Sequence, residues 1–302
     1  MVEKASKIVI DKVIGRKLDK KEGFISNEDA ILYSLGIGFS EDPLKKQDLD
    51  FTYELSDNFQ VFPTQLGTYS LMLNVQLLEE HPFIPNFNYM SLLHGEQWTE
   101  LVKPFQPGMK IFYDSELIDF EDKGSGTVFM FANNFYDEEG KLVLKSKTIL
   151  FVRDVKGHGY KSNGPLKQKI IPNKIPESSP LKTIVVTTNK NQALLYRIGG
   201  KDLNPLHVDS NMAKMGGFDV PILHGMCSYG MTCKAVYQSL CPDDLSNIIS
   251  FNARFTSHVF PGETLIVEIF RSKGNVLLVS AKTKERGKQI LIGEIEMKQT
   301  KF

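Results

Sequence analysis

A short segment near position 200 gathers residue types that can handle a water molecule. Asp202, Asn204 and His207 stand within six positions of one another. Gly200 and Pro205 make the segment a poor candidate for a regular helix. A carboxylate, an amide and an imidazole on one stiff loop can hold a single water and move its protons. We therefore take this segment as the candidate catalytic site.

A second candidate group follows in Ile222-Leu-His-Gly-Met226, just before a predicted helix. Gly225 would open that helix, so its N–H would lack a partner within the helix and would have the helix dipole behind it. Such a donor can stabilise negative charge on an oxygen, and glycine lets a ligand come close. We expect His224 to anchor the start of the helix in a supporting role.

The bulk composition excludes several classes of protein. The chain has 302 residues, 41% of them hydrophobic, and its 36 basic residues balance its 36 acidic ones. Such a balance gives no sign of a nucleic-acid partner. No apolar run approaches the ~20 residues that span a bilayer. The spacing of Cys227, Cys233 and Cys241 fits no paired zinc pattern, so we expect reduced, packed cysteines and no metal.

The chain contains an internal repeat. Residues 27–38 resemble residues 189–200, each read as a helix with Asn at its start and Gly at its end. Longer helices are predicted at 67–78 and 225–240, and Leu71, Met72, Val75 and Leu78 of the first share one stripe. Strand-like segments follow each helix, at 109–118, 126–136, 141–153, 264–271, 275–283 and 289–298.

This pattern predicts an α+β fold made of two similar halves. The halves are residues 1–154 and 181–302, and residues 155–180, rich in Gly and Pro, form a linker across the surface. In each half an antiparallel sheet must bury one apolar face, and the long helix is the available cover. A helix wrapped by such a sheet is a hot-dog arrangement, so we expect a double hot dog, a fused pseudo-dimer.

The two halves differ at the candidate site. Where the second half has Asp202 to His207, the first half has Phe39-Ser-Glu-Asp-Pro-Leu-Lys-Lys46, with lysine in place of histidine. One chemical site per chain is therefore expected. The first half, which lacks the acid–base pair, is free to shape a pocket.

These motifs resemble the signature of the R-specific (type-2) enoyl-CoA hydratases of the MaoC-like family, including the hydratase unit of peroxisomal multifunctional enzyme type 2. The resemblance rests on the segment from Tyr196 to His207 and on Ile222-Leu-His-Gly-Met226. In the first half, Tyr33-Ser-Leu-Gly-Ile-Gly38, Leu93-His-Gly-Glu-Gln97 and the turn at residues 123–126 resemble the N-terminal half of two-domain members.

The resemblance implies reversible addition of water to a trans-2-enoyl-CoA, giving the (3R)-3-hydroxyacyl-CoA of fatty-acid β-oxidation. His207 would take a proton from water, Asp202 would hold the same water, and Asn204 would orient it. No cofactor is implied. The compartment implied is the peroxisome, although Thr300-Lys301-Phe302 does not match the Ser-Lys-Leu address, and the cytoplasm is the alternative.

Further residues are weaker candidates. Glu54 resembles an acidic position of the eukaryotic family and is expected to support the site by a hydrogen bond. Phe83, Phe87 and Tyr89 are a candidate acyl wall, although a core role is as consistent with the sequence. Arg254 and Lys234 could meet CoA phosphates. The remaining histidines are His94, a structural or pocket residue, and His81, His158 and His258, with no constellation around them.

Two other readings stay open from the sequence. One is another hot-dog activity, such as a thioester dehydratase or hydrolase. The other is a non-catalytic acyl-CoA-binding protein, which would be expected to lose Asp202 or His207. A homodimer is compatible with either.

Overall fold

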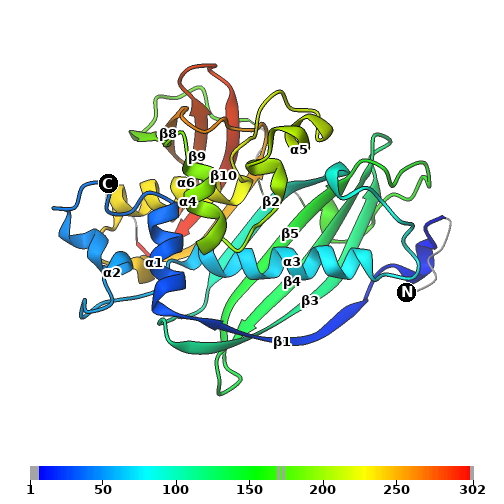
Figure 1. Ribbon diagram of the computed structural model, residues 1–302, viewed down its shortest axis with the longest axis horizontal. Coiled ribbons are helices and arrows are strands. Elements are labelled where there is room, and N and C mark those ends of the chain that lie inside the picture. Colours follow the sequence, from blue (N-terminus) through cyan, green and yellow to red (C-terminus); the bar gives the residue numbers. More distant parts are fainter. Residues whose placement is uncertain (1–6, 169–170, 172–173, 300–302) are drawn as a thin grey trace.

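A single ten-stranded antiparallel sheet organises the chain in the computed structural model, which describes residues 7–168, 171 and 174–299 (Figure 1). Residues 300–302, whose motif was considered above, lie outside the described part. The strands are β1 (Lys17–Ile25), β2 (Leu92–Leu101), β3 (Met109–Asp122), β4 (Thr127–Tyr136), β5 (Leu142–Val152), β6 (Lys182–Thr187), β7 (Ile248–Phe255), β8 (Thr264–Arg271), β9 (Val276–Thr283) and β10 (Gln289–Met297).

The strand order repeats across the middle of the sheet. It runs β1-β3-β4-β5-β2-β7-β10-β9-β8-β6, so each strand of the second half occupies the place of its counterpart in the first. The seam is the β2–β7 pair, where Trp98 faces Asn252. The predicted double hot dog is confirmed, with the two halves joined in one sheet.

The helices lie on one face of this sheet (Figure 1). They are α1 (Asn27–Gly36), α2 (Leu49–Thr52), α3 (Leu66–Glu79), α4 (Gln192–Gly199), α5 (Ser210–Met215) and α6 (Gly225–Leu240), with short 3-10 turns η1 (Ile10–Lys12), η2 (Lys46–Asp48), η3 (Pro63–Gln65), η4 (Tyr89–Ser91), η5 (Pro165–Lys167), η6 (Pro205–His207) and η7 (Leu245–Asn247). The two long central helices are α3 and α6.

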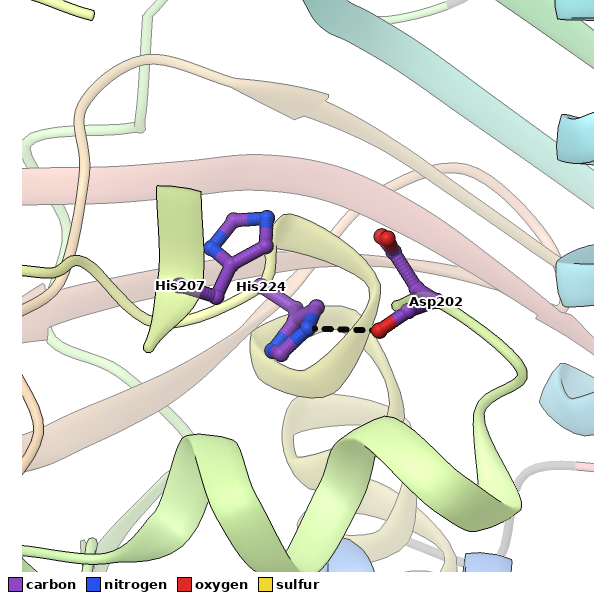
Figure 2. Close-up of side chains that lie close together, drawn as sticks. All are labelled: Asp202, His207 and His224. Carbon is purple, nitrogen blue, oxygen red and sulfur yellow. Dashed lines mark hydrogen bonds between the residues drawn. The ribbon is translucent and has the colours of Figure 1, made fainter. Parts of the chain in front are cut away.

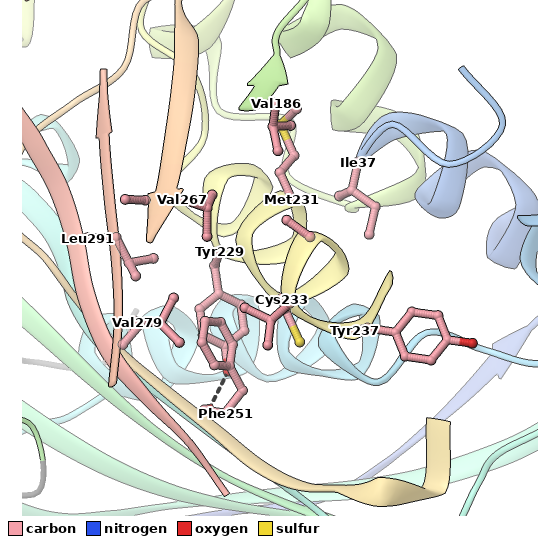
Figure 3. Packing of buried hydrophobic residues seen from close by; sticks show 14 of the residues in the cluster. Ile37, Val186, Tyr229, Met231, Cys233, Tyr237, Phe251, Val267, Val279 and Leu291 are labelled. Carbon is pink, nitrogen blue, oxygen red and sulfur yellow. Dashed lines mark hydrogen bonds between the residues drawn. The ribbon is translucent and has the colours of Figure 1, made fainter. Parts of the chain in front are cut away.

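Helix α6 is the core of the second half. Figure 3 shows Tyr229 and Cys233 of α6 against Phe251, Val267 and Val279 of the surrounding strands. All of these side chains are buried. The Tyr229 hydroxyl donates a hydrogen bond to the Phe251 carbonyl oxygen at 2.6 Å, so the one polar tip is satisfied inside the core.

Helix α3 differs in detail from its predicted stripe. Met72 is 44% exposed, whereas Leu73 and Leu77 are buried. The reason is that α3 is enclosed on more than one side, so a single stripe underestimates its buried surface.

The repeated glycines have a role that the sequence interpretation missed. A Cβ built on Gly199 would stand 2.2 Å from the Tyr33 backbone nitrogen, and one on Gly36 would stand 2.9 Å from the Tyr196 Cα. Helices α1 and α4 therefore cross in backbone contact and join the two halves. The helix starts also differ from expectation: Ser26 caps α1 by accepting from Asp29 N–H at 3.1 Å, and α4 starts at Gln192.

The segment after β5 is fixed to the sheet more firmly than a surface linker would be. The buried Asp119 carboxylate accepts hydrogen bonds from the Ser162 hydroxyl at 2.6 Å and the Leu166 N–H at 2.9 Å. The Tyr160 ring stacks on Phe120 with centroids 4.4 Å apart. The proposed boundaries at 154 and 180 stay a prediction.

None of the helices in the described residues is long and apolar enough to cross a membrane.

Candidate active site

One cavity brings the catalytic candidates together. It has a volume of about 410 Å³ and is lined from both halves. The second half supplies the polar residues, and the first half supplies mainly apolar ones. The residues that line it are Leu71, Val75, Tyr89, Leu92, Leu93, His94, Asp202, Asn204, Leu206, His207, Phe218, Ile222, Leu223, Gly225, Met226, Ser228, Phe255, Thr256, Ser257, His258, Val259 and Ile290.

The loop after α4 holds Asp202 and Asn204 by local backbone bonds. Oδ1 of Asp202 accepts from the Asn204 N–H at 3.1 Å, and Oδ1 of Asn204 accepts from the Leu206 N–H at 3.0 Å. This Asx-type bonding, together with Pro205 at the start of η6, gives the loop its shape. It leaves the second carboxylate oxygen of Asp202 and the amide NH₂ of Asn204 to act on a ligand.

His207 is arranged as a base. Its Nδ1 lies 2.8 Å from the Ile222 carbonyl oxygen, which can only accept, so Nδ1 carries the proton and Nε2 keeps its lone pair. Burial lowers the pKa of His207, and the nearby Asp202 charge opposes that shift. The imidazole is therefore neutral and able to accept a proton near pH 7.

His224 supports the cluster from the start of α6. Its Nε2 lies 3.1 Å from the Asp202 backbone carbonyl oxygen, and its ring stacks on His207 with centroids 3.8 Å apart (Figure 2). Burial holds the pKa of His224 well below its usual value, so the ring that stacks on His207 is neutral. This placement agrees with the supporting role predicted for it.

Gly225 opens α6 and lines the same cavity, as expected from the sequence. The nearest atom to a Cβ built on it is Cε1 of Phe255 at 3.6 Å, an ordinary contact. Protein packing therefore does not require glycine here. The free space lies beside an N–H at the positive end of the helix dipole, where a ligand oxygen could bind.

Three predicted site residues lie away from this cavity. Glu54 is exposed just after α2. Phe83 lies against His81, with ring centroids 6.1 Å apart, and Phe87 packs against the first-half core. None of the three lines the cavity among the residues described for it, so we leave them out of the proposed site. For Phe83 and Phe87, the sequence gave no information on the direction taken by the loop after α3.

Arg254 and Lys234 do not line this cavity, so they are not placed to bind CoA there. Arg254 pairs with Glu96 at 2.6 Å in a second cavity of about 290 Å³. Its neighbour Phe255 lines the first cavity, and alternation along β7 puts the two side chains on opposite faces of the sheet. Lys234 is buried and donates to the Gly38 carbonyl oxygen at 2.5 Å.

Further lining residues include Tyr89 and His94, which the sequence interpretation named as wall and pocket candidates. Tyr89 lines the cavity from η4, and His94 lines it from β2, in line with its reading as a pocket residue. Burial lowers the pKa of His94 to about 4, and its Nε2 lies 3.1 Å from Oε1 of Gln97. His258, read as ordinary, also lines the cavity, and no sequence signal marked it.

The first-half counterpart of the site is filled. The rings of Phe39 and Phe51 are in tilted contact with centroids 4.5 Å apart, and Phe62 and Tyr237 pack edge-on against Phe51. Nearby, Lys45 pairs with Asp48 at 3.4 Å. Aromatic packing takes the room that a second substrate would need, which agrees with one site per chain.

The stacking of the two imidazole rings disfavours a metal ion at this cluster. Single ligand atoms of Asp202, His207 and His224 lie within 4.8 Å of one another. Each imidazole uses one nitrogen for a backbone carbonyl and keeps the other as an acceptor, but the two rings stack. Stacked rings direct their lone pairs side by side rather than toward one point, so the arrangement suits a water better than a metal ion.

The fold and the site define a double hot-dog protein with one acid–base cluster and an apolar cavity. Two family models match the chain: the MFE-2 hydratase 2 N-terminal domain over residues 24–154, and the MaoC like domain over residues 172–291. The chain belongs to the enoyl-CoA hydratase 2 family of MaoC-like proteins.

Individual proteins agree with this assignment. A probable enoyl-CoA hydratase 2 of Dictyostelium discoideum is 34% identical over 284 residues, covering 93% of this chain and 94% of that protein. The peroxisomal enoyl-CoA hydratase 2 of Arabidopsis thaliana is 33% identical over 300 residues, covering 95% of each. A MaoC-like dehydratase of Phytophthora capsici superposes with a TM-score of 0.83 at 30% identity, covering 97% of this chain and 100% of that one.

Proposed function

We propose that this chain catalyses the reversible hydration of trans-2-enoyl-CoA thioesters to (3R)-3-hydroxyacyl-CoA in fatty-acid β-oxidation. The observation that carries the proposal is the single cavity in which Asp202, His207 and Gly225 face an apolar wall from the other half. The chain's similarity to enoyl-CoA hydratases 2 along nearly its whole length supports the same reaction.

The geometry suggests how the proton transfers are divided. A water held by the free oxygen of Asp202 gives one proton to Nε2 of His207 while its oxygen bonds to C3 of the enoyl group. The electrons of the C2–C3 double bond move toward the thioester oxygen, where the Gly225 N–H stabilises the charge. The protonated cluster then returns a proton to C2, so the net change is the addition of one water.

One cluster on one face of the substrate predicts syn addition. The alternative of a non-catalytic acyl-CoA-binding protein is not favoured, because both members of the acid–base pair are present and converge on one cavity. The substrate is a CoA thioester, and the peroxisome is the proposed compartment because the Arabidopsis thaliana relative is named peroxisomal. A homodimer remains a prediction that light scattering would test.

The proposal is tested with the purified protein and trans-2-decenoyl-CoA. We expect loss of the ultraviolet absorbance of the conjugated thioester, with (3R)-3-hydroxydecanoyl-CoA as the product on chiral analysis. An (S) product, or no absorbance change with wild-type protein that is shown to be folded, would overturn it.

A further inference from the structure

A second cavity, of about 290 Å³, lies on the face of the sheet opposite the helices. Strands β2, β4, β5 and β7 form its floor, and the turn η5 covers it with Pro165 and Leu166. Arg254 lines this cavity while its neighbour Phe255 lines the catalytic one, so the sheet separates the two. We call it the outer cavity. The proposed reaction makes no use of it.

The strand register places three hydrogen-bond donors in one row on the floor of the outer cavity. Lys147 of β5 pairs with Trp98 of β2, and Trp98 pairs with Asn252 of β7. Directly paired residues point to the same face of a sheet, with Cβ atoms about 4.5–5.5 Å apart. All three residues line the cavity, and we call them the donor row.

The donor row is not engaged by the part of the protein that the structure describes. There, the Lys147 ammonium pairs with no carboxylate and lies 4.9 Å from the centroid of the Trp98 ring. Asn252 is 6% exposed, and only its amide oxygen is enclosed without a partner, which leaves its NH₂ group to reach the cavity. Polar groups in such positions are usually satisfied by a ligand or by ordered water.

The other cations that line the outer cavity are already neutralised. Arg254 donates to the Glu96 carboxylate at 2.6 Å, and Lys123 pairs with Glu121 at 3.0 Å. Among the described residues, Lys147 is therefore the lining cation that has no acidic partner. One uncompensated positive charge suits a ligand that carries a single negative charge.

An acidic residue at the end of the row limits where that charge can lie. Glu294 of β10 pairs with Asn252 on the side away from Trp98, and it does not line the cavity among the residues described for it. Repulsion from its carboxylate favours an anion over Lys147 and Trp98, at the opposite end of the row.

The rest of the outer cavity is suited to a short hydrocarbon chain. Met130 and Ile149 are paired across β4 and β5 and line the floor beside the donor row. Leu166 covers them, and its N–H donates to the buried Asp119 carboxylate at 2.9 Å, so the cover is fixed to the sheet. The volume is near the lower limit of about 300 Å³ for small-molecule sites, which indicates a small ligand.

We propose that the outer cavity binds a monocarboxylate with a short apolar chain. The carboxylate accepts hydrogen bonds from the donor row, and the chain lies beneath Leu166. The two cavities share no lining residue in the described part of the chain, so this proposal does not depend on the proposed function.

The test uses octanoate, below the concentration at which it forms micelles, and the fluorescence of Trp98. Because Trp98 is the only tryptophan of the chain, its emission reports on the outer cavity. We expect a saturable shift to shorter wavelength as the ligand replaces water around the ring. Octan-1-ol keeps the chain without the charge and should bind at least about tenfold more weakly, since hydrogen bonds to an ionised group are the stronger ones.

Three variants test the charge, with calorimetry as a second readout because a change at Lys147 also alters the tryptophan emission. Lys147→Met keeps most of the stem and should weaken octanoate binding at least about tenfold, whereas Lys147→Arg should retain it. Lys145→Met is the matched control. Lys145 lies on the same face of β5, pairs with Glu100 at 3.2 Å and does not line the cavity, so its loss should leave the affinity unchanged.

Three results would overturn the proposal: no saturable binding of octanoate to wild type, equal affinity for octan-1-ol, or an unchanged affinity in Lys147→Met that is shown to be folded by circular dichroism. Octanoate could also enter the catalytic cavity, so the titration is repeated with saturating decanoyl-CoA. The affinity should not change, and displacement of octanoate by decanoyl-CoA would also overturn the proposal. If wild type hydrates no enoyl-CoA but binds octanoate through Lys147, the proposed function fails and the outer site stands.

Discussion

Replacing Gly225 by alanine separates the needs of catalysis from those of folding. The added Cβ would meet no atom closer than Cε1 of Phe255 at 3.6 Å, so the fold can accept it without movement. Its φ is outside the left-handed region that favours glycine. The free energy of unfolding should therefore stay within about 0.5 kcal/mol of wild type.

The activity of Gly225→Ala should fall strongly for the same geometric reason. The methyl group occupies space beside the N–H that we assign to the thioester oxygen, and displacing that oxygen loses the hydrogen bond when charge develops. Loss of one oxyanion donor lowers kcat by roughly 10²–10³-fold. Because this interaction strengthens in the transition state, the loss should appear in kcat more than in KM.

Gly199→Ala is the matched control, because it makes the same glycine-to-alanine change at a position where packing, and not catalysis, requires glycine. Its Cβ would stand 2.2 Å from the Tyr33 nitrogen, a backbone atom that cannot turn aside. Overpacking of this kind costs about 1–3 kcal/mol, and the melting temperature should drop by several degrees, at ~2–4 °C per kcal/mol. Thermal unfolding and steady-state kinetics on both variants form the assay. A Gly225→Ala enzyme with wild-type kcat would refute the oxyanion assignment.

Three further predictions follow from the same contacts. Because burial lowers the pKa of His207, kcat/KM should remain high down to a pH below the ordinary value of ~6.5 for histidine, and a pH–rate profile that falls already above pH 7 on its acid side contradicts this. Burial lowers the pKa of His94 to about 4 in the folded protein, whereas the ordinary value in an unfolded chain is ~6.5. Between these two values the unfolded chain binds the proton and the folded protein does not, so the free energy of unfolding should decrease as pH falls from ~6.5 toward 4. Urea unfolding at several pH values would measure this decrease. Glu54→Gln should leave kcat/KM unchanged, since Glu54 is exposed and away from the cavity; a large loss would restore it to the site.

Much of the fold could be predicted because the sequence contains an internal repeat, so each half supports the interpretation of the other. The two long helices and the strands β3, β4, β5, β8, β9 and β10 carry clear apolar periodicity, and the repeat identified the two halves. The edge strands were harder: β1 reads Lys-Leu-Asp-Lys-Lys-Glu from Lys17, with too few apolar residues to signal a strand. Its place is fixed by pairing with β3, a partner far along the chain.

The site could be predicted where its residues lie close together in the sequence. It could not be predicted where a residue's position depends on which face of the sheet its strand directs it to. Asp202, Asn204 and His207 share one loop, and Gly225 follows from the start of a helix. Arg254 depends on the phase of β7, which decides the face of the sheet and was not visible in the sequence. No local pattern reports His258. Tyr89 was named as a candidate wall residue together with Phe83 and Phe87, and it is the one of these three that lines the cavity.

The paired role of Asp202 and His207 is tested most directly by the kinetics of Asp202→Ala, His207→Ala and the double variant. Each single variant should lose about 10²–10⁴-fold in kcat/KM while keeping the wild-type circular dichroism spectrum. Since residues that act as a unit are not additive, the double variant should be about as slow as the slower single variant. Near-wild-type turnover in either single variant would contradict the account.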